Sequence, residues 1–214
     1  HGAPANALQA RVQAIISSGN TQFENFKSYT FDNDLNQIIT EEIPVFDGKL
    51  DAKGKTDFPL NLDLEGKRLP GMLNIRFKNR VFETGGDFSS DYEVFQYSPF
   101  SHYVGLKLPK TKEWANALRS DVVNEIKIAT VTEDGDNASR KKILVQLYDV
   151  RWRWWWDRSG DESLGSYIRN HANSLILTDT ASTKNGNGSY QLRFPERSWG
   201  RKILVLTDIE SGHS

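Results

Sequence analysis

The feature that most constrains this chain is a period of two in its apolar residues. Leu8, Ala10, Val12 and Ala14 alternate with polar neighbours, and residues 72–79 alternate in the same way. Successive side chains of a strand point to opposite faces, so this period indicates half-buried β-strands. Residues 143–148 and 203–208 are apolar on more than one face, as in a central strand of a sandwich. The sequence therefore predicts an all-β fold.

Short turn motifs separate these apolar runs. Asp47-Gly48, Asp134-Gly135 and Asn185-Gly186 are dipeptides that supply the positive φ angles of tight hairpins. Many short strands separated in this way are typical of an antiparallel sandwich or barrel. Helical spacing of apolar residues is scarce, and the two candidate helical segments are Lys112–Arg119 and Asp161–Asn173.

The length of the chain allows two domains of ordinary size. Its 214 residues divide most naturally at Tyr97-Ser98-Pro99-Phe100. A strand-like run over 91–96 ends there, a proline follows, and a new apolar run begins at Tyr103. We therefore predict domains 1–98 and 99–214, each of a size suited to one β-sandwich.

Charge and composition exclude several kinds of site and partner. The 27 basic and 28 acidic residues are mixed along the chain, so neither nucleic acid nor an anionic membrane is favoured as a partner. The absence of cysteine excludes disulfides, thiolate metal sites and a cysteine nucleophile. No apolar run approaches the roughly 20 residues of a membrane span, so direct membrane insertion is not expected. The chain begins without methionine or a signal peptide, so we expect an excised part of a longer protein.

The most unusual motif is a run of tryptophan and arginine before Asp157. On a strand, Trp152, Trp154 and Trp156 share one face. Arg151, Arg153 and Trp155 share the opposite face. The favoured interpretation is packing within a domain or between domains, with the arginines stacked on rings or paired with acids. The alternative is a carbohydrate-binding or adhesive surface, or one that stacks on single-stranded bases. The residues of this candidate interface or ligand-stacking site are Arg151, Trp152, Arg153, Trp154, Trp155 and Trp156.

No arrangement of residues predicts catalysis or a cofactor. His1, His102, His171 and His213 lack the spacing of a zinc motif, and there is no Gly-x-Ser-x-Gly elbow. The acidic motifs at 32–34 and 134–136 lack the remaining ligands of a calcium loop, so turns and caps are favoured, with a weak surface calcium site left open. The sequence therefore predicts no catalytic residue, no metal site, no cofactor and no enzymatic activity.

Several segments together resemble one known family, the bacterial α2-macroglobulins, particularly those of Bacteroidetes. They occur in the order found in the family and cover most of the chain. The segments are Gly2-Ala3-Pro4-Ala5, Arg80-Val81-Phe82-Glu83-Thr84-Gly85-Gly86-Asp87-Phe88-Ser89, Tyr97-Ser98-Pro99-Phe100, Tyr103-Val104-Gly105-Leu106, Val145-Gln146-Leu147-Tyr148 with Arg151–Asp157, and Trp199–Asp208 with Glu210-Ser211-Gly212-His213.

This resemblance implies two consecutive macroglobulin domains, which are immunoglobulin- or fibronectin-like antiparallel sandwiches. The first strand of the first domain could lie before His1. The domains would be non-catalytic structural parts of a protease-trapping inhibitor at the cell envelope, in the periplasm or on the outer membrane, often as a lipoprotein. The partners would be neighbouring domains of the parent protein and the proteases that cut its bait region. The family's Cys-x-Glu-Gln thioester motif is absent from this chain, which has no cysteine.

Overall fold

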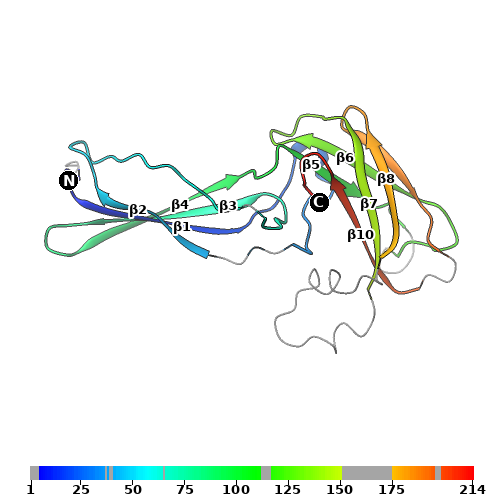
Figure 1. Ribbon diagram of the computed structural model, residues 1–214, viewed down its shortest axis with the longest axis horizontal. Helices are drawn as coiled ribbons and strands as arrows, with labels where there is room; N and C mark the ends of the chain where they lie inside the picture. The colour runs from blue at the N-terminus through cyan, green and yellow to red at the C-terminus, as the bar shows by residue number, and fades with distance from the viewer. Residues whose placement is uncertain are drawn as a thin grey trace. The chain divides into compact units, whose positions relative to one another are not determined.

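The computed structural model describes residues 5–36, 38, 41–64, 66–111, 117–150, 175–195 and 199–214. Within these residues every pairing between strands is antiparallel (Figure 1). The prediction of an all-β fold with antiparallel sheets is therefore confirmed. The elements are β1 (Gln9–Ser18), η1 (Glu24–Phe26), β2 (Glu41–Lys49), β3 (Leu73–Phe82), β4 (Phe88–Tyr97), β5 (His102–Lys107), β6 (Asn124–Thr132), β7 (Arg140–Val150), β8 (Leu175–Thr183), β9 (Asn187–Leu192) and β10 (Arg201–Asp208).

The chain divides into two compact units that do not follow a single cut in the sequence. The first unit contains His1–Gly19, Ile38–Arg68 and Met72–Tyr97, and the second contains Asn20–Gln37, Leu69–Gly71 and Ser98–Ser214. From Ser98 onward all residues belong to the second unit. Two earlier segments also belong to that unit, and neither carries a strand of the kind that a period of two would reveal.

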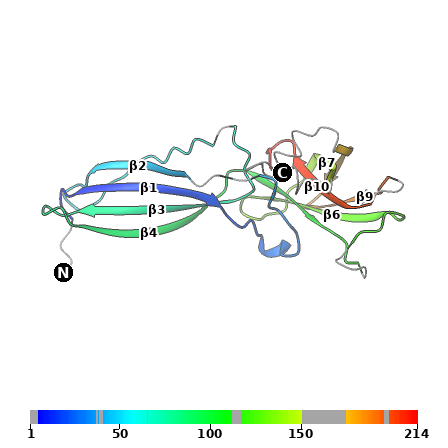
Figure 2. The same ribbon diagram turned by 90° about the horizontal axis from the view of Figure 1, so that it is seen from below.

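The first unit is built on a four-stranded sheet with the strand order β2-β1-β3-β4 (Figure 2). The alternation along β1 places Val12 and Ala14, with their apolar neighbours on the same face, in the core. On this face Phe58, from the segment after β2, packs against Phe46 of β2 and Phe77 of β3, with ring centroids 5.7 and 6.5 Å apart. A segment outside the strands therefore helps to cover the apolar face of this sheet.

The predicted turn at Asp47-Gly48 is wrong, because both residues lie inside β2. Asp47 pairs in register with Arg11 of β1, and its Oδ2 forms an ion pair with Nε of Arg11 at 2.9 Å. The turn lies just beyond the strand, where the Asp51 carboxylate accepts a hydrogen bond from the Lys55 amide and Gly54 has a φ of +74°. The register and the ion pair with β1 outweigh the turn preference of an aspartate–glycine pair.

The second unit has two three-stranded sheets, β10-β7-β8 and β5-β6-β9 (Figure 1). The two sheets share a core, in which Val104 and Ile128 of one sheet pack with Ile143, Val145 and Leu206 of the other. β7 is the central strand of its sheet, in agreement with the apolar pattern over 143–148. The same prediction for 203–208 is wrong, because these residues lie in β10, which is an outer strand of the three. The predicted sandwich is therefore confirmed in this unit.

The other two predicted turns are confirmed by the backbone. Gly135 has a φ of +87° in the turn after β6, and the Thr132 amide donates to the Asp136 carbonyl at 2.8 Å. Asn185 and Gly186, which connect β8 to β9, have φ angles of 52° and 75°. Positive φ at both central residues is the requirement of a type I′ hairpin turn.

The two predicted helical segments fall mainly outside the described residues. Residues 112–116 and 161–173 are not described, and 117–119 contain no helix. The helical residues that are described form the single 3-10 turn η1, which the sequence did not predict. η1 brings Phe26 against Phe31, with ring centroids 6.4 Å apart, so its role is to fold this segment into the core of the second unit.

Gly105 of β5 provides a test of the packing between this segment and the sandwich. A Cβ at Gly105 would lie 2.6 Å from the ring of the buried Phe31. We expect Gly105→Ala to lower the free energy of unfolding by about 1–3 kcal/mol, the usual cost of overpacking a core. Denaturant unfolding followed by circular dichroism measures the loss. Gly85→Ala is the matched control, because a Cβ there meets nothing within 4 Å; equal effects of the two substitutions would contradict the prediction.

Candidate functional site

The tryptophan and arginine residues predicted as an interface or ligand-stacking site lie outside the described residues. Arg151, Trp152, Arg153, Trp154, Trp155 and Trp156 follow directly after β7, which ends at Val150. Their packing therefore stays a prediction. The polar groups that the described structure does bring together lie elsewhere in the second unit, around the end of β10.

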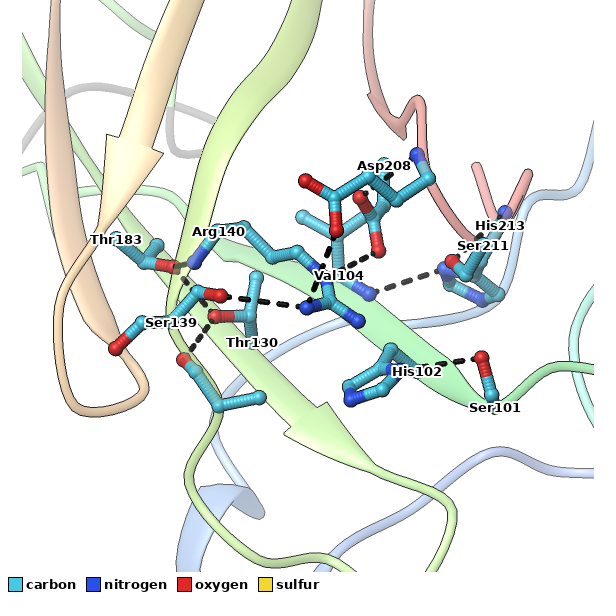
Figure 3. Close-up of polar contacts among 12 residues, drawn as sticks. Ser101, His102, Val104, Thr130, Ser139, Arg140, Thr183, Asp208, Ser211 and His213 are labelled. Atoms are coloured by element: carbon cyan, nitrogen blue, oxygen red, sulfur yellow. Dashed lines mark hydrogen bonds and ion pairs between the residues drawn. The ribbon is translucent and has the colours of Figure 1, made fainter.

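The last residues of the chain fold back on the end of β10. The Gly212 amide donates to the Asp208 carbonyl, and the Asp208 amide donates to the His213 carbonyl, both at 2.8 Å. Gly212 has a φ of +77°, a backbone conformation that glycine adopts without steric cost. This tight turn places the side chain of His213 in the core with no exposed surface (Figure 3).

The imidazole of His213 is held by an amide and by two aromatic rings. Its Nδ1 accepts a hydrogen bond from the Val104 amide of β5 at 3.1 Å. Because Nδ1 is the acceptor, we assign the proton of the neutral ring to Nε2. The ring lies edge-on to Phe100 and tilted against Tyr103, with centroid distances of 5.0 and 4.6 Å. His213 thus attaches the end of the chain to the β5 sheet.

Burial keeps His213 neutral at pH 7. Desolvation lowers the pKa of the imidazole to about 4, against the weaker opposing effects of Asp208 and the Phe31 backbone, which favour the charged ring. Nε2 forms no hydrogen bond of standard geometry with the described residues, so the Phe31 backbone offers only a long or poorly aligned partner. The loss of hydration on burial outweighs the attraction of the Asp208 carboxylate, so the neutral ring is favoured.

Asp208 is a fully buried carboxylate paired with Arg140 of β7. The Arg140 Nε lies 2.8 Å from Oδ2 of Asp208, and the side chains are 12% and 0% exposed. The Glu210 amide donates to Oδ1 of Asp208 at 3.2 Å. A buried carboxylate is expensive to desolvate unless it is paired and hydrogen-bonded, and both conditions are met here.

The same centre connects the two sheets through hydroxyl groups. The Thr130 hydroxyl of β6 donates to the Ala138 carbonyl at 2.7 Å and shares a hydrogen bond of 2.5 Å with the Thr183 hydroxyl of β8. The Arg140 amide donates to Thr183 Oγ1 at 3.1 Å. Thr130 and Thr183 belong to different sheets, so this short chain of hydrogen bonds joins β6, β7 and β8 across the sandwich.

This arrangement holds the fold together and offers no activated nucleophile. Nδ1 of His213 is occupied by a backbone amide, and the Ser211 hydroxyl nearby only accepts a hydrogen bond from the His213 amide, at 3.3 Å. Because the imidazole is fully buried, it could not exchange protons with a substrate in solvent. Within the described ranges, no three histidine, aspartate or glutamate side chains gather as metal ligands would.

A groove of about 250 Å³ lies between residues 30–35 and β10. Its lining is largely apolar, and Asp32, Asp34 and Arg201 are its charged residues. The Asp32 carboxylate is engaged, because it accepts a hydrogen bond from the Thr21 amide at 3.1 Å. The predicted turn at 32–34 agrees with the contact of Asn33, whose Oδ1 accepts a hydrogen bond from the Leu35 amide at 3.0 Å.

Sequence reasoning missed the roles of Arg140, Asp208 and His213. His213 was considered only as a possible metal or catalytic residue near the end of the chain. The available signal was Asp208 at the end of an apolar strand, followed by Gly212 and His213, which indicates a turn that returns the chain to the core. Val104 is 109 residues from its partner His213, and Arg140 is 68 residues from its partner Asp208. No local pattern reveals such pairings.

Two family profiles match the chain in tandem. The bacterial α2-macroglobulin MG5 domain matches residues 1–87, and bacterial macroglobulin domain 6 matches residues 105–214. The chain belongs to the bacterial α2-macroglobulin family. Its described strands are therefore those of two macroglobulin domains, as the sequence resemblance implied, and proteins of this family are protease traps. Macroglobulin domains are generally non-catalytic, in agreement with a centre built for folding.

A solved structure of the family shows the same fold at low sequence identity. The crystal structure of trypsin-activated α2-macroglobulin from Escherichia coli is 14% identical, with a TM-score of 0.61 over 99% of this chain. Salmonella α2-macroglobulin reacted with methylamine is also 14% identical, with a TM-score of 0.49 over 98% of this chain. This chain spans about 14% of the length of either protein. No curated protein sequence matches it. The described residues contain no helix with the length and hydropathy of a membrane span.

The pairing of Arg140 with Asp208 predicts a large effect of removing the cation alone. Arg140→Met leaves a buried carboxylate without a charged partner, so we expect a loss of about 3–5 kcal/mol in the free energy of unfolding. The double substitution Arg140→Met with Asp208→Leu should recover much of this loss, because it removes the buried charge. Urea unfolding of the single and double variants measures both. Arg119→Met is the surface control, with a side chain 56% exposed; a loss as large as that of Arg140→Met would contradict the prediction.

The buried His213 predicts a dependence of stability on pH. Its folded pKa of about 4 lies below the ordinary value of 6.5, so the unfolded chain binds the extra proton first. The contribution of His213 to the free energy of unfolding is fully present above pH 6.5. It falls by about 3 kcal/mol as the pH is lowered to about 4. His213→Asn, whose carbonyl can accept from the Val104 amide, should flatten unfolding stability over this pH range. His102→Asn should keep the slope of the parent chain; an unchanged slope in His213→Asn would show the prediction to be wrong.

Proposed function

We propose that this chain is a non-catalytic scaffold segment of a larger protease-trapping inhibitor. The observation that carries the proposal is the tandem match of MG5 and MG6 profiles along nearly the whole chain. The polar centre around Arg140, Asp208 and His213 supports it, since its groups are engaged with one another or with backbone groups. The domain boundary that we propose for the two macroglobulin domains is the sequence one, 1–98 and 99–214.

We further propose that the parent protein is of the Bacteroidetes type and acts as a lipoprotein at the cell envelope, in the periplasm or associated with the outer membrane. The support is the sequence resemblance at 80–89, 97–106 and 199–213. The partners of this segment are then neighbouring domains of the same protein and, through its bait region, the proteases that it traps. In this proposal the tryptophans at 152 and 154–156, with Arg151 and Arg153, pack within a domain or between domains.

The physical contribution of such a segment is rigidity. A trap must convert a cut at one site into a rearrangement elsewhere, and stiff domains transmit such a change where soft ones absorb it. The buried contacts of Asp208 and His213 fix the end of β10 to both sheets of the sandwich. A force applied to the C-terminal end of this unit is therefore passed to its core.

Trypsin inhibition by the longer natural protein tests this function. We expect trypsin mixed with that protein to lose activity on casein and keep activity on a small chromogenic peptide, because a trapped protease is shielded only from large substrates. Arg140→Met in the longer protein should reduce the trapped fraction severalfold, whereas Arg119→Met should not. The 214-residue chain alone should leave the activity of trypsin on casein unchanged. Unchanged casein hydrolysis with the longer protein would contradict the proposal.

Tryptophan fluorescence of the 214-residue chain separates packing from the glycan-binding alternative. Trp199 is 82% exposed and adds red-shifted emission of its own, so the measurement uses a Trp199→Phe background. In that background we expect blue-shifted emission, weak quenching by acrylamide and no response to a panel of glycans. Red-shifted emission that a glycan alters would favour a carbohydrate-binding surface at 152–156.

A further inference from the structure

The sheet of the first unit carries a row of cations on the face that points away from its core. Arg76, Lys78 and Arg80 are alternate residues of β3, so their side chains share one face. The buried Leu73 and Ile75 have the other parity and lie on the core face. β3 runs between β1 and β4 (Figure 2), so these cations follow one another along the interior of the sheet and not along an edge.

The strand register places apolar side chains beside this row. Arg76 lies between Ile15 of β1 and Val94 of β4, and Lys78 lies beside Tyr92 of β4. Val94 and Tyr92 are each more than half exposed. Apolar neighbours displace part of the water around a charge, and an ion pair formed there is stronger than one in bulk solvent.

The acidic residues of this face do not balance its cations. Of the described side chains, five basic and two acidic ones lie on it, which leaves a surplus of three positive charges. The basic residues are Arg11, Lys49, Arg76, Lys78 and Arg80, and the acidic residues are Glu42 and Asp47. Because the whole chain has 27 basic and 28 acidic residues, this surplus is a local property of the face.

The two carboxylates are already engaged by two of the cations. Oδ2 of Asp47 lies 2.9 Å from Nε of Arg11, and Oε1 of Glu42 lies 3.6 Å from Nζ of Lys78. Both acidic side chains belong to β2, on the far side of β1 from the cationic row. They border the row on one side without neutralising it.

The two other cations of the row lack an acidic partner. Arg76 and Arg80 form no ion pair with a described residue, and the Nε of Arg80 is buried without a hydrogen-bond partner there. The Arg80 guanidinium lies 5.6 Å from the centroid of the Phe88 ring, which fixes its position over the sheet. Two guanidinium groups are therefore available to an anion from outside the described structure.

We propose that this face binds an acidic segment of a partner polypeptide in extended conformation, with carboxylates at alternate positions. Alternate residues of an extended chain are roughly 6.7 Å apart, both in β3 and in such a partner. A segment aligned with β3 sets three successive carboxylates against Arg76, Lys78 and Arg80. Guanidinium groups bind carboxylates through two parallel hydrogen bonds. The inference does not depend on the proposed function, because it uses only the sheet of the first unit.

The shape of the charged row favours a linear partner over an anionic membrane. The row is one strand wide, with Glu42 and Asp47 on the β2 side and apolar residues of β4 on the other. It ends at Arg80, because the hairpin that follows carries Glu83 and Asp87. A flat anionic surface would meet these four carboxylates as well as the cations, whereas a single strand above β3 meets the cations alone.

Peptide binding to the 214-residue chain tests the inference. The probes TETETET, TEEETTT and TQTQTQT carry a neutral fluorophore; the second has the composition of the first without its alternation, and the third lacks charge. In 50 mM salt, fluorescence anisotropy should show TETETET binding at least fivefold tighter than TQTQTQT and at least threefold tighter than TEEETTT. Affinity for TETETET should fall as salt is raised, because exposed ion pairs are screened.

Three results would overturn the inference. The first is equal affinity for TETETET and either of the other peptides, and the second is no binding of TETETET. The third is displacement of TETETET by heparin or by phosphatidylglycerol vesicles at a lower anion concentration than unlabelled TETETET requires, which would indicate a general anion-binding surface.

Charge-reversal variants locate the binding to β3. Arg76→Glu with Lys78→Glu should weaken TETETET binding at least tenfold. Lys53→Glu with Lys55→Glu makes the same change of charge on exposed residues outside the strands and should alter the affinity by less than twofold. Arg76→Gln, which only removes one exposed charge, should weaken binding severalfold. Melting temperatures of all variants check the fold. Equal losses in the two double variants, or full binding by Arg76→Gln, would contradict the assignment to this face.

Discussion

The carboxylate of Asp208 is fully buried at the end of β10, and its charge is tolerable there only because Arg140 of β7 approaches to 2.8 Å. Much of the second unit is organised around this pair. The turn that follows Asp208 directs His213 into the core, where its imidazole accepts a bond from β5. The backbone amide of the same arginine donates to Thr183, which shares a hydrogen bond with Thr130 of the facing sheet. The charge pair joins β7 and β10 of one sheet, and the hydrogen bonds of His213 and Thr183 beside it reach the facing sheet.

Buried polar centres of this kind specify one arrangement of a fold more than they stabilise it. An apolar core of similar volume could hold two sheets together with equal or greater stability, but many alternative registers would satisfy it nearly as well. The carboxylate of Asp208 has few positions in which it can meet a cation and an amide together. These contacts hold the end of β10 in one position relative to both sheets of the second unit.

The two outer strands of the first unit's sheet, β2 and β4, differ in sequence and in the regularity of their pairing. β2 carries a proline and a register shift, whereas β4 presents ten exposed residues in uninterrupted register. The alternation along β1 and β3 accounts for the buried face of this sheet, but it carries no information on which strand lies at the edge. Edge position follows from the strand order, and only that order shows that no described strand lies on the outer side of β4.

The sequence by itself determined the all-β class, the central position of β7, the turns at Gly135 and Asn185-Gly186, and the family. These properties depend on the period of side chains along a strand or on residues that adopt positive φ, and both are local. The tertiary structure decided the rest. It placed Asp47-Gly48 within β2, because pairing with β1 outweighed the turn preference of two residues. It also joined residues 20–37 to the second unit and brought Arg140, Asp208 and His213 together. Those contacts join residues far apart in the chain, and their energy comes from burial and charge pairing that exist only once the sheets have packed.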